Sequence, residues 1–307
     1  MRFLLGSVMM ACVAQGAAAA DKINATYKFY WKGLLVSEAN TSATIGDDAY
    51  DFALDFRMRG VAKLFANGRS QARVEGAIHD GAPIPVRYEN SGRWDGKDYA
   101  QTMTFDAAGS LIENKLDWPE KWLKEFKREP VPEDMQVGPD PASIVIALIQ
   151  QSLADVSGEA PYVVRSFDGD SVFDWDVSCS AETVDLEPSG KSEFSGAAHE
   201  CGFGGTLVAG KRILTEKQKK KAEKRRRKEE KRRAKGKEVD EPKPPKIWVQ
   251  SFDDGAYLLP VRAEVSTGMG RVTMYLTEFS LDDLPAVSQA SLSGAQAATD
   301  AQGEGAE

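Results

Sequence analysis

Histidine and cysteine are scarce in this sequence, and the catalytic motifs that need them are absent. The 307 residues contain two histidines, His79 and His199, and three cysteines. Ser-His-Asp and Cys-His arrangements both need a histidine base, and neither histidine lies in a recognisable motif. There is also no G-x-S-x-G turn and no C-x-x-C pair. We therefore expect a protein that is not an enzyme and that needs no cofactor.

Long apolar runs are lacking as well, apart from Phe3–Val13 near the N-terminus. A membrane-spanning helix needs about 20 apolar residues, and this run has about half that length. A positive residue precedes the run and small alanines follow it, which is typical of a secretory signal peptide over 1–20. The sequence predicts cleavage after Ala20 and a soluble periplasmic protein that starts at Asp21. A lipid anchor on Cys12 is the alternative, but the preceding residues match a lipoprotein cleavage box poorly.

Cleavage leaves Cys179 and Cys201 as the remaining cysteines. An isolated pair in an oxidising compartment usually forms a disulfide. Closing a loop of this length stabilises a fold by about 3 kcal/mol in the chain-entropy model. We interpret the pair as a structural disulfide rather than a redox centre, because redox pairs usually have C-x-x-C spacing.

The charge is distributed very unevenly. Residues 217–246 hold 16 Lys/Arg and 6 Asp/Glu, a net charge of +10, so the remainder carries −18 of the total of −8. The segment 216–245 has no apolar face, which predicts a solvated insertion between two strands. A functional alternative is electrostatic attachment to anionic lipid, lipopolysaccharide or an acidic envelope component. An exported protein meets no nucleic acid. The residues that would make this contact are Lys224, Arg225, Arg226, Arg227, Lys228, Arg232 and Arg233.

Alternation of apolar and polar residues from 24 to 105 predicts a meander of β-strands. The clearest case is Tyr50–Met58, where five large apolar side chains alternate with Asp51, Asp55 and Arg57. Further strands are expected at about 69–79, 84–94, 98–106 and 110–115. Asp95-Gly96 supplies the residues that a tight hairpin turn needs.

Two helices are predicted in the middle of the chain. Trp118, Trp122 and Phe126 recur every four residues, so they share one stripe of a short helix that packs on the sheet; a membrane-surface helix is the alternative. Asp140 is expected to cap a second helix over 141–155. The predicted buried face of this second helix consists of Ile144, Val145, Leu148, Ile149 and Leu153.

Strand patterns resume after this helix. Asp168-Gly169 separates the first pair of strands, 162–167 and 171–177, and Asp253-Asp254-Gly255 separates the second, 247–252 and 256–267. Another strand is expected over 271–279, and residues 285–307 have almost nothing to bury, which predicts disorder. We therefore expect one β-rich domain over 21–284. Its fold class is mainly β: an antiparallel, highly curved or barrel-like meander with one or two packed helices.

Several short motifs, taken together in this order, resemble one protein family. They are Tyr27 with Gly33, Pro85-Val86-Arg87-Tyr88, Phe105-Asp106, Pro139-Asp140-Pro141-Ala142-Ser143, Phe167-Asp168-Gly169, Cys201, and Leu259-Pro260-Val261-Arg262 before Gly270. The chain resembles, over about 25–280, the bacterial exported proteins grouped as domain of unknown function 3108 (DUF3108). The resemblance implies an antiparallel sheet that curls into a barrel in the periplasm. It implies no catalytic residues.

Asp168, Asp170, Asp174 and Asp176 suggest calcium, because closely spaced carboxylates suit a hard cation. However, a hairpin turn explains Asp168, and Asp174 and Asp176 fall on the polar face of a strand. Their spacing matches no calcium loop, so we expect no metal site.

Two functions remain open from the sequence. The first is a non-catalytic periplasmic protein that binds an envelope component and supports cell-envelope integrity. The alternative is a carrier or sensor of a lipid or other apolar ligand inside the curved sheet, which the aromatic residues on strand faces favour. These residues are Phe29, Phe52, Phe56, Trp94 and Trp175.

Overall fold

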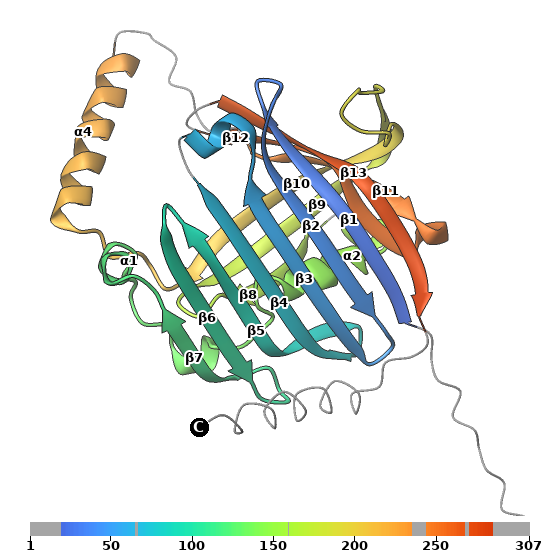
Figure 1. The fold of residues 1–307 in the computed structure, drawn as a ribbon, viewed down its shortest axis with the longest axis horizontal. Coiled ribbons are helices and arrows are strands. Elements are labelled where there is room, and N and C mark those ends of the chain that lie inside the picture. The colour runs from blue at the N-terminus through green and yellow to red at the C-terminus, as the bar shows by residue number, and fades with distance from the viewer. Residues whose placement is uncertain (1–19, 65–66, 159, 235–243, 268–269, 285–307) are drawn as a thin grey trace, which may run out of the picture.

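The computed structural model describes residues 20–64, 67–158, 160–234, 244–267 and 270–284. Within these residues, thirteen strands form one antiparallel sheet that curves strongly, so that β8–β10 cross behind β2–β6 (Figure 1). The mainly β, strongly curved class expected from the sequence is confirmed. The predicted tail 285–307 and residues 1–19 of the predicted signal peptide lie outside the described residues.

The strands are β1 (Ala20–Trp31), β2 (Leu34–Ile45), β3 (Ala49–Met58), β4 (Gly68–His79), β5 (Ala82–Trp94), β6 (Lys97–Phe105), β7 (Leu111–Asp117), β8 (Tyr162–Phe167), β9 (Val172–Leu186), β10 (Gly196–Ala209), β11 (Lys246–Phe252), β12 (Tyr257–Thr267) and β13 (Gly270–Leu284). The helices are α1 (Glu120–Glu125), α2 (Ser143–Ile149), α3 (Leu153–Val156) and α4 (Glu216–Arg233), with 3₁₀ turns at Gly60–Leu64, Glu133–Met135 and Asp253–Gly255.

The strand order makes β7 and β8 the two edges of the sheet. The order is β7-β6-β5-β4-β3-β2-β1-β13-β12-β11-β10-β9-β8, and each neighbouring pair is antiparallel. With thirteen alternating strands, the two edge strands run in the same direction. A closed barrel in which every neighbouring pair is antiparallel needs an even number of strands. β7 and β8 therefore cannot pair with each other in antiparallel fashion to close this sheet.

Side chains bridge the gap between the two edges. The Gln101 amide in β6 donates a hydrogen bond to the backbone oxygen of Asp168 at 3.0 Å, and the Asn114 amide in β7 donates to the oxygen of Gly169 at 3.0 Å. Gly169 has a φ of 98° and a Cβ there would lie 2.4 Å from the Gln101 amide nitrogen. The turn between β8 and β9 therefore contacts the opposite edge closely.

The alternation read from the sequence determines which face of each strand is buried. In β3, Phe52 is buried, and Leu54 and Phe56 pack against the core, while Asp51 and Asp55 lie on the outer face. The predicted turn at Asp95-Gly96 is confirmed. Both residues have positive φ values, 49° and 78°, as a tight hairpin turn requires.

Helix α2 lies inside the curved sheet and contacts β5, β8 and β12 (Figure 1). Ile146 is fully buried, in one cluster with Phe52, Val74 and Met103 from the strands. The Asp140 carboxylate, also fully buried, accepts hydrogen bonds from the backbone amides of Ala142 and Ser143 and from the Ser143 hydroxyl. Burial raises the pKa of Asp140, and the carboxylate caps α2 as the sequence predicted.

The prediction of one helix over 141–155 with a single buried face is wrong in two respects. The chain forms two short helices, because Ser152 starts a new helix with a capping box to Asp155. Val145 is exposed and Leu148 is half-buried, whereas Ile146 is buried. A helix surrounded by the sheet buries more than one face, so helical periodicity did not identify its core side.

The long hairpin of β9 and β10 also differs from expectation. The sequence predicts a strand over 171–177 only, but β9 continues to Leu186, and most of the polar stretch between Cys179 and Cys201 is paired strand, from Cys201↔Cys179 to Gly196↔Leu186. Residues 180–185 are exposed on both faces, so no apolar alternation marks them. Strand β10 ends at Ala209, and beyond it the Ile213 amide donates a hydrogen bond to the Lys127 oxygen.

The buried cap of α2 gives the first testable prediction. Asp140→Ala removes the acceptor of three hydrogen bonds in the core, so the free energy of unfolding should fall by about 2–4 kcal/mol. Urea unfolding followed by far-UV circular dichroism measures this. Asp134→Ala, at an exposed position, is the control and should change little. Equal midpoints for both variants would show that the cap contributes nothing.

Candidate functional site

A cleft of about 720 Å³ lies between β5, β6 and β7 on one side and α1 on the other. It opens on the inner face of the sheet, because Tyr88 lines it and also belongs to the core cluster around α2. We call this hollow the aromatic cleft. Its aromatic lining consists of Tyr88, Trp94, Tyr99, Trp118, Trp122 and Phe126.

Contacts between rings fix the wall that α1 contributes. The ring centroids of Trp118 and Trp122 are 6.4 Å apart and those of Trp118 and Phe126 are 6.5 Å apart, both edge to face. Trp122 also reaches Tyr99 of β6, with centroids 5.7 Å apart. The predicted helix is shorter than expected, because α1 covers only Glu120–Glu125 and Trp118 and Phe126 flank it. The three rings still contact one another, and Trp122 joins them to the sheet. Aromatic pairs of this geometry stabilise their arrangement beyond simple burial.

Glycines let two of the rings lie against the sheet. Gly68 pairs with Trp94, and a Cβ at Gly68 would lie 2.2 Å from the indole ring. Gly92 pairs with Tyr99, and a Cβ there would lie 2.8 Å from the Tyr99 hydroxyl. Both rings thus occupy space that side chains would fill in an ordinary strand, and they form the floor of the cleft.

Polar groups gather at the inner end of the cleft. Arg128 contacts Asp170, with Nε and Oδ1 3.1 Å apart, and donates from Nη1 to the Gly210 oxygen at 2.9 Å. Asp168 holds the turn by accepting from the Ser171 amide at 2.7 Å and the Ser171 hydroxyl at 2.6 Å. The cleft therefore combines aromatic walls with a charged, hydrogen-bonding end, which is typical of sites for ligands that are partly apolar.

Asp170 is the titratable group of this end. Burial, together with the neighbouring Asp168 carboxylate, raises the pKa of Asp170 to about 6, although Arg128 opposes the shift. The charge at the inner end of the cleft therefore changes between mildly acidic and neutral pH.

Elsewhere the inner face is covered. Helix α2 occupies the region of Tyr50 and Val74, and the end of the β9–β10 hairpin packs against β1, β2 and β13 through Leu186 and Ala198. The curved sheet is thus filled in part by its own chain, and the aromatic cleft lies beside this filled region.

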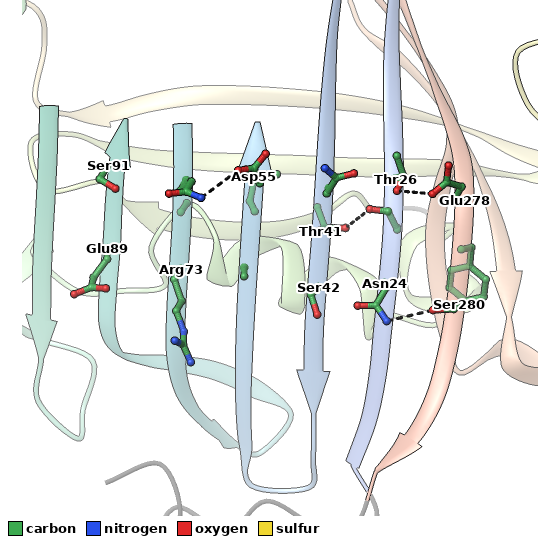
Figure 2. A pocket seen from close by; sticks show the side chains of 17 residues that line it. Asn24, Thr26, Thr41, Ser42, Asp55, Arg73, Glu89, Ser91, Glu278 and Ser280 are labelled. Carbon is green, nitrogen blue, oxygen red and sulfur yellow. Dashed lines mark hydrogen bonds between the residues drawn. The ribbon is translucent and has the colours of Figure 1, made fainter. Parts of the chain in front are cut away.

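A second hollow, about 780 Å³, lies along β13 and β1–β5 (Figure 2). Several of its polar side chains pair with each other across strands. Asn24 donates to Ser280 at 3.2 Å, Thr26 to Glu278 at 3.3 Å, and Gln71 to Asp55 at 3.2 Å. Such pairing is usual for the solvated face of an antiparallel sheet, so we do not assign this groove a ligand.

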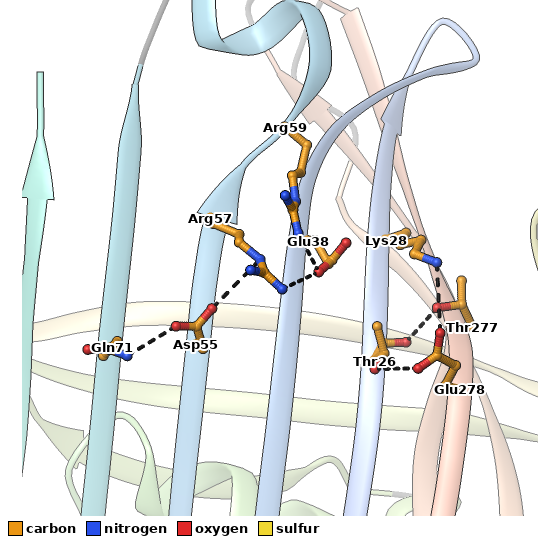
Figure 3. A network of polar contacts seen from close by, with 9 residues as sticks. All are labelled: Thr26, Lys28, Glu38, Asp55, Arg57, Arg59, Gln71, Thr277 and Glu278. Carbon is orange, nitrogen blue, oxygen red and sulfur yellow. Dashed lines mark hydrogen bonds and ion pairs between the residues drawn. The ribbon is translucent and has the colours of Figure 1, made fainter.

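Charged residues on the same face extend this pairing (Figure 3). Glu38 accepts from Arg57 at 2.8 Å and from Arg59 at 3.1 Å. Burial opposes ionisation of Glu38, but the hydrogen bonds from Arg59 and Arg57 outweigh it and lower the pKa of Glu38. This network joins β2 to β3 and to Arg59, the residue that follows β3, so we interpret its role as structural.

The two cysteines of the predicted pair lie opposite each other on β9 and β10. A disulfide joins Cys179 and Cys201, whose Cα atoms are 3.9 Å apart. Both side chains are buried in a cluster with Val156 of α3 and Leu258 of β12. The disulfide thus lies inside the fold rather than in the cleft, and it is consistent with an exported protein.

The basic residues predicted to make an electrostatic contact fall on α4, which projects from the body of the protein beside α1 (Figure 1). The structure separates them from the cleft lining: the start of α4 contacts the end of α1 through Gln218, and these residues lie further along the helix. Arg227 pairs with Glu223 at 2.6 Å and Arg226 with Glu230 at 3.5 Å, each four residues apart along the helix. Lys220, Lys224, Lys228 and Lys231 lie along one side of the helix.

Three of the four aspartates considered for calcium, Asp168, Asp170 and Asp174, have other contacts. Arg165 forms an ion pair with Asp174 at 2.6 Å, and Arg128 forms one with Asp170. Asp168 accepts a hydrogen bond from the Ser171 amide in the turn between β8 and β9. Within the described residues, no group of three or more His, Cys, Asp or Glu is arranged to hold a metal ion. His79 lies beside Asp80 and His199 contacts the Ser180 oxygen, and neither lines the aromatic cleft.

Sequence reasoning did not find the aromatic cleft as a site. It noted the stripe on 118–126 and placed Trp94 on a strand face, but the pairing of Gly68 with Trp94 and of Gly92 with Tyr99 depends on strand register. A usable signal was the recurrence of glycine and aromatic residues in consecutive predicted strands.

A curved antiparallel sheet that encloses a helix places this protein among the β-barrel-like proteins. Within the described part of the chain, no helix is long and apolar enough to cross a membrane.

Comparison with known proteins agrees with the resemblance noted in the sequence. The family described as "Protein of unknown function (DUF3108)" matches residues 26–195, and the chain belongs to this family. Nothing in that description assigns a reaction. No curated protein matches the sequence. The chain is also similar to the crystal structure of a β-barrel-like protein of domain of unknown function DUF1849 from Brucella abortus, with a TM-score of 0.39 and 9% sequence identity, over 87% of this chain and 99% of that chain.

The disulfide gives the second prediction. Replacing both cysteines by alanine frees a loop whose ends are 22 positions apart, so the free energy of unfolding should fall by about 3 kcal/mol. The strand signal in circular dichroism should persist. Thiol titration of protein isolated without reductant should find Cys179 and Cys201 unreactive, and reactive thiols at these two positions would refute the pairing.

The third prediction concerns Asp170. Its raised pKa means that the folded state binds a proton more tightly than the unfolded state, so Asp170 stabilises the fold below its unfolded pKa and this stability is lost as pH rises to about 6. Asp170→Asn should therefore lose less stability than the wild type between about pH 4 and pH 7 in urea unfolding.

Asp174→Asn is the matched control with the opposite sign. The hydrogen bonds from Arg165 lower the pKa of Asp174, so the stability that Asp174 contributes is present above its unfolded pKa of about 4 and is lost as pH falls below it. Asp174→Asn should lack that loss at low pH and should follow the wild type between about pH 4 and pH 7. Identical pH profiles for the two variants would contradict the assignment of the raised pKa to Asp170.

Proposed function

We propose that this protein is a non-catalytic binding protein of the cell envelope, and that it holds a ligand with an apolar part and a polar end in the aromatic cleft. The observation that carries the proposal is the convergence of six aromatic residues from β5, β6, α1 and the residues on either side of α1 on one hollow inside the curved sheet. Aromatic walls bind apolar groups, and Gln101, Arg128 and Asp170 offer hydrogen bonds to a polar end.

The same proposal places the mature protein in the periplasm, as one β-rich domain over 21–284, after cleavage behind Ala20. Cleavage there keeps Asp21, whose carboxylate accepts a hydrogen bond from the Tyr257 hydroxyl and joins the start of β1 to β12. The buried disulfide supports an oxidising compartment.

A second candidate is a structural component that supports envelope integrity through contact with another envelope molecule. The charge of α4 favours it, because a helix with twelve basic and four acidic residues attracts anionic surfaces. This candidate needs no ligand in the cleft, so a binding assay separates the two.

The fourth prediction tests the cleft with a dansyl-labelled fatty acid as probe. Three of the six tryptophans, Trp94, Trp118 and Trp122, line the cleft, so energy transfer from tryptophan to the dansyl group should report binding. Trp122→Ala removes a wall and should weaken binding by about tenfold or more, because burying an aromatic side chain contributes about 1.5–3 kcal/mol. Gly68→Ala should also weaken binding, because its Cβ displaces Trp94.

Tyr30→Ala is the control. Tyr30 packs on Tyr275 with centroids 5.8 Å apart and does not line the cleft, so this variant should bind as the wild type does. Equal affinity for the wild type and Trp122→Ala, or no binding by any variant, would refute the cleft proposal. Native mass spectrometry of protein from its own periplasm, with lipid extraction, then identifies the natural ligand class.

A further inference from the structure

Helix α4 is joined firmly to the wall of the aromatic cleft. Thr215 and Gln218 form a reciprocal cap, with the Thr215 amide 2.9 Å from the Gln218 side-chain oxygen and the Gln218 amide 3.3 Å from the Thr215 hydroxyl. The Gln218 side-chain amide then donates to the Glu125 oxygen at the end of α1, at 3.2 Å. The start of α4 and the end of α1 are therefore bonded to each other at one corner of the molecule.

Further bonds strengthen this corner. Arg212 donates to the same Glu125 oxygen at 2.9 Å, and the amides of Ile213 and Glu129 bond to the oxygens of Lys127 and Lys211. The Arg212 guanidinium also lies 4.6 Å from the ring centre of Phe126. The direction in which α4 leaves the body (Figure 1) is thus set by contacts with the segment that carries the cleft wall.

The helix itself has no apolar face that could pack on the body. Its eighteen residues include twelve Lys/Arg and four Asp/Glu, a net charge of +8, and Ala222 is its single apolar residue. Its described side chains are exposed apart from that of Gln218. Like charges at this density repel each other and destabilise the helix. Contact with an anionic surface would reduce this repulsion.

Exposed apolar side chains lie in the segments that meet at this corner. Leu123 and Phe126 belong to the α1 region and Ile213 and Leu214 directly precede α4, with exposed fractions of 44%, 41%, 41% and 39%. A cationic helix together with neighbouring apolar side chains provides the two signals, electrostatic and hydrophobic, that stable peripheral membrane binding requires. We call α4 with these four residues the basic corner.

We infer that the basic corner docks this protein on a bilayer that contains anionic phospholipid. Charge complementarity favours a bilayer over a protein partner, because the basic residues surround the helix rather than forming one shaped recognition site. Each basic residue near such a surface raises the partition about fivefold. Docking through the basic corner brings the α1 wall of the aromatic cleft to the membrane. Only the role of the cleft at the membrane rests on the proposed function.

Vesicle sedimentation tests the docking with the full mature chain. Vesicles of phosphatidylcholine with about 30% phosphatidylglycerol should bind the protein at low salt, whereas vesicles of phosphatidylcholine alone should not. Binding should fall at least about tenfold when salt rises to about 0.5 M, because salt screens exposed charges.

Charge reversal locates the contact. The triple variant Lys220→Glu, Lys224→Glu and Lys228→Glu changes one side of α4 and should lose binding at least about tenfold. The matched control reverses Lys32, Lys63 and Lys115, which are exposed outside α4, with the same change in net charge, and it should stay within about twofold. Leu214→Ser should weaken the binding that remains at high salt.

Equal binding to both kinds of vesicle, unchanged binding of the α4 variant, or an equal loss in the control would overturn the inference. Binding to lipopolysaccharide or to an acidic protein, without binding to the phosphatidylglycerol vesicles, would also overturn it. The dansyl-probe assay on the α4 variant distinguishes the two proposals, because probe binding should survive in that variant while vesicle binding should survive in Trp122→Ala.

Discussion

The parity of the strands constrains the rest of this structure. Within the described residues, thirteen antiparallel strands leave β7 and β8 running in the same direction, so the curved sheet cannot close with another antiparallel pair. These two strands are also consecutive along the chain, so the segment between them crosses from one edge to the other. On the way it places α2 inside the sheet and α1 beside β6 and β7. The core and the aromatic cleft both result from this crossing.

Different interactions stabilise the two parts of the interior. Around α2, apolar side chains from many strands surround the helix, and one buried carboxylate, Asp140, caps it through hydrogen bonds. Around the cleft, ring contacts and the bonds of Gln101 and Asn114 to the β8–β9 turn hold the edges in place. The first arrangement leaves no room for a ligand beside Ile146, whereas the second leaves a hollow because glycines replace larger side chains under Trp94 and Tyr99.

The structure shows where the uneven charge of the chain lies. An acidic body carries one strongly basic helix, and the Thr215–Gln218 cap and the bond to Glu125 attach that helix next to the cleft wall. The ligand binding and the surface attachment that we propose thus involve neighbouring parts of one molecule. The outer face of β1–β5, in contrast, satisfies its polar groups by pairing them across strands.

The sequence by itself determined the mainly β class, most strands, the hairpin turns, the family resemblance and the cap at Asp140, because alternation and turn residues act over a few positions. Tertiary structure decided which sides of α2 are buried, since a helix enclosed by a sheet has no single apolar stripe. It also decided that residues 180–185 form a strand although both faces are exposed. The cleft depended on register across β4, β5 and β6, which brings Gly68 under Trp94 and Gly92 under Tyr99, and local sequence patterns do not specify that register.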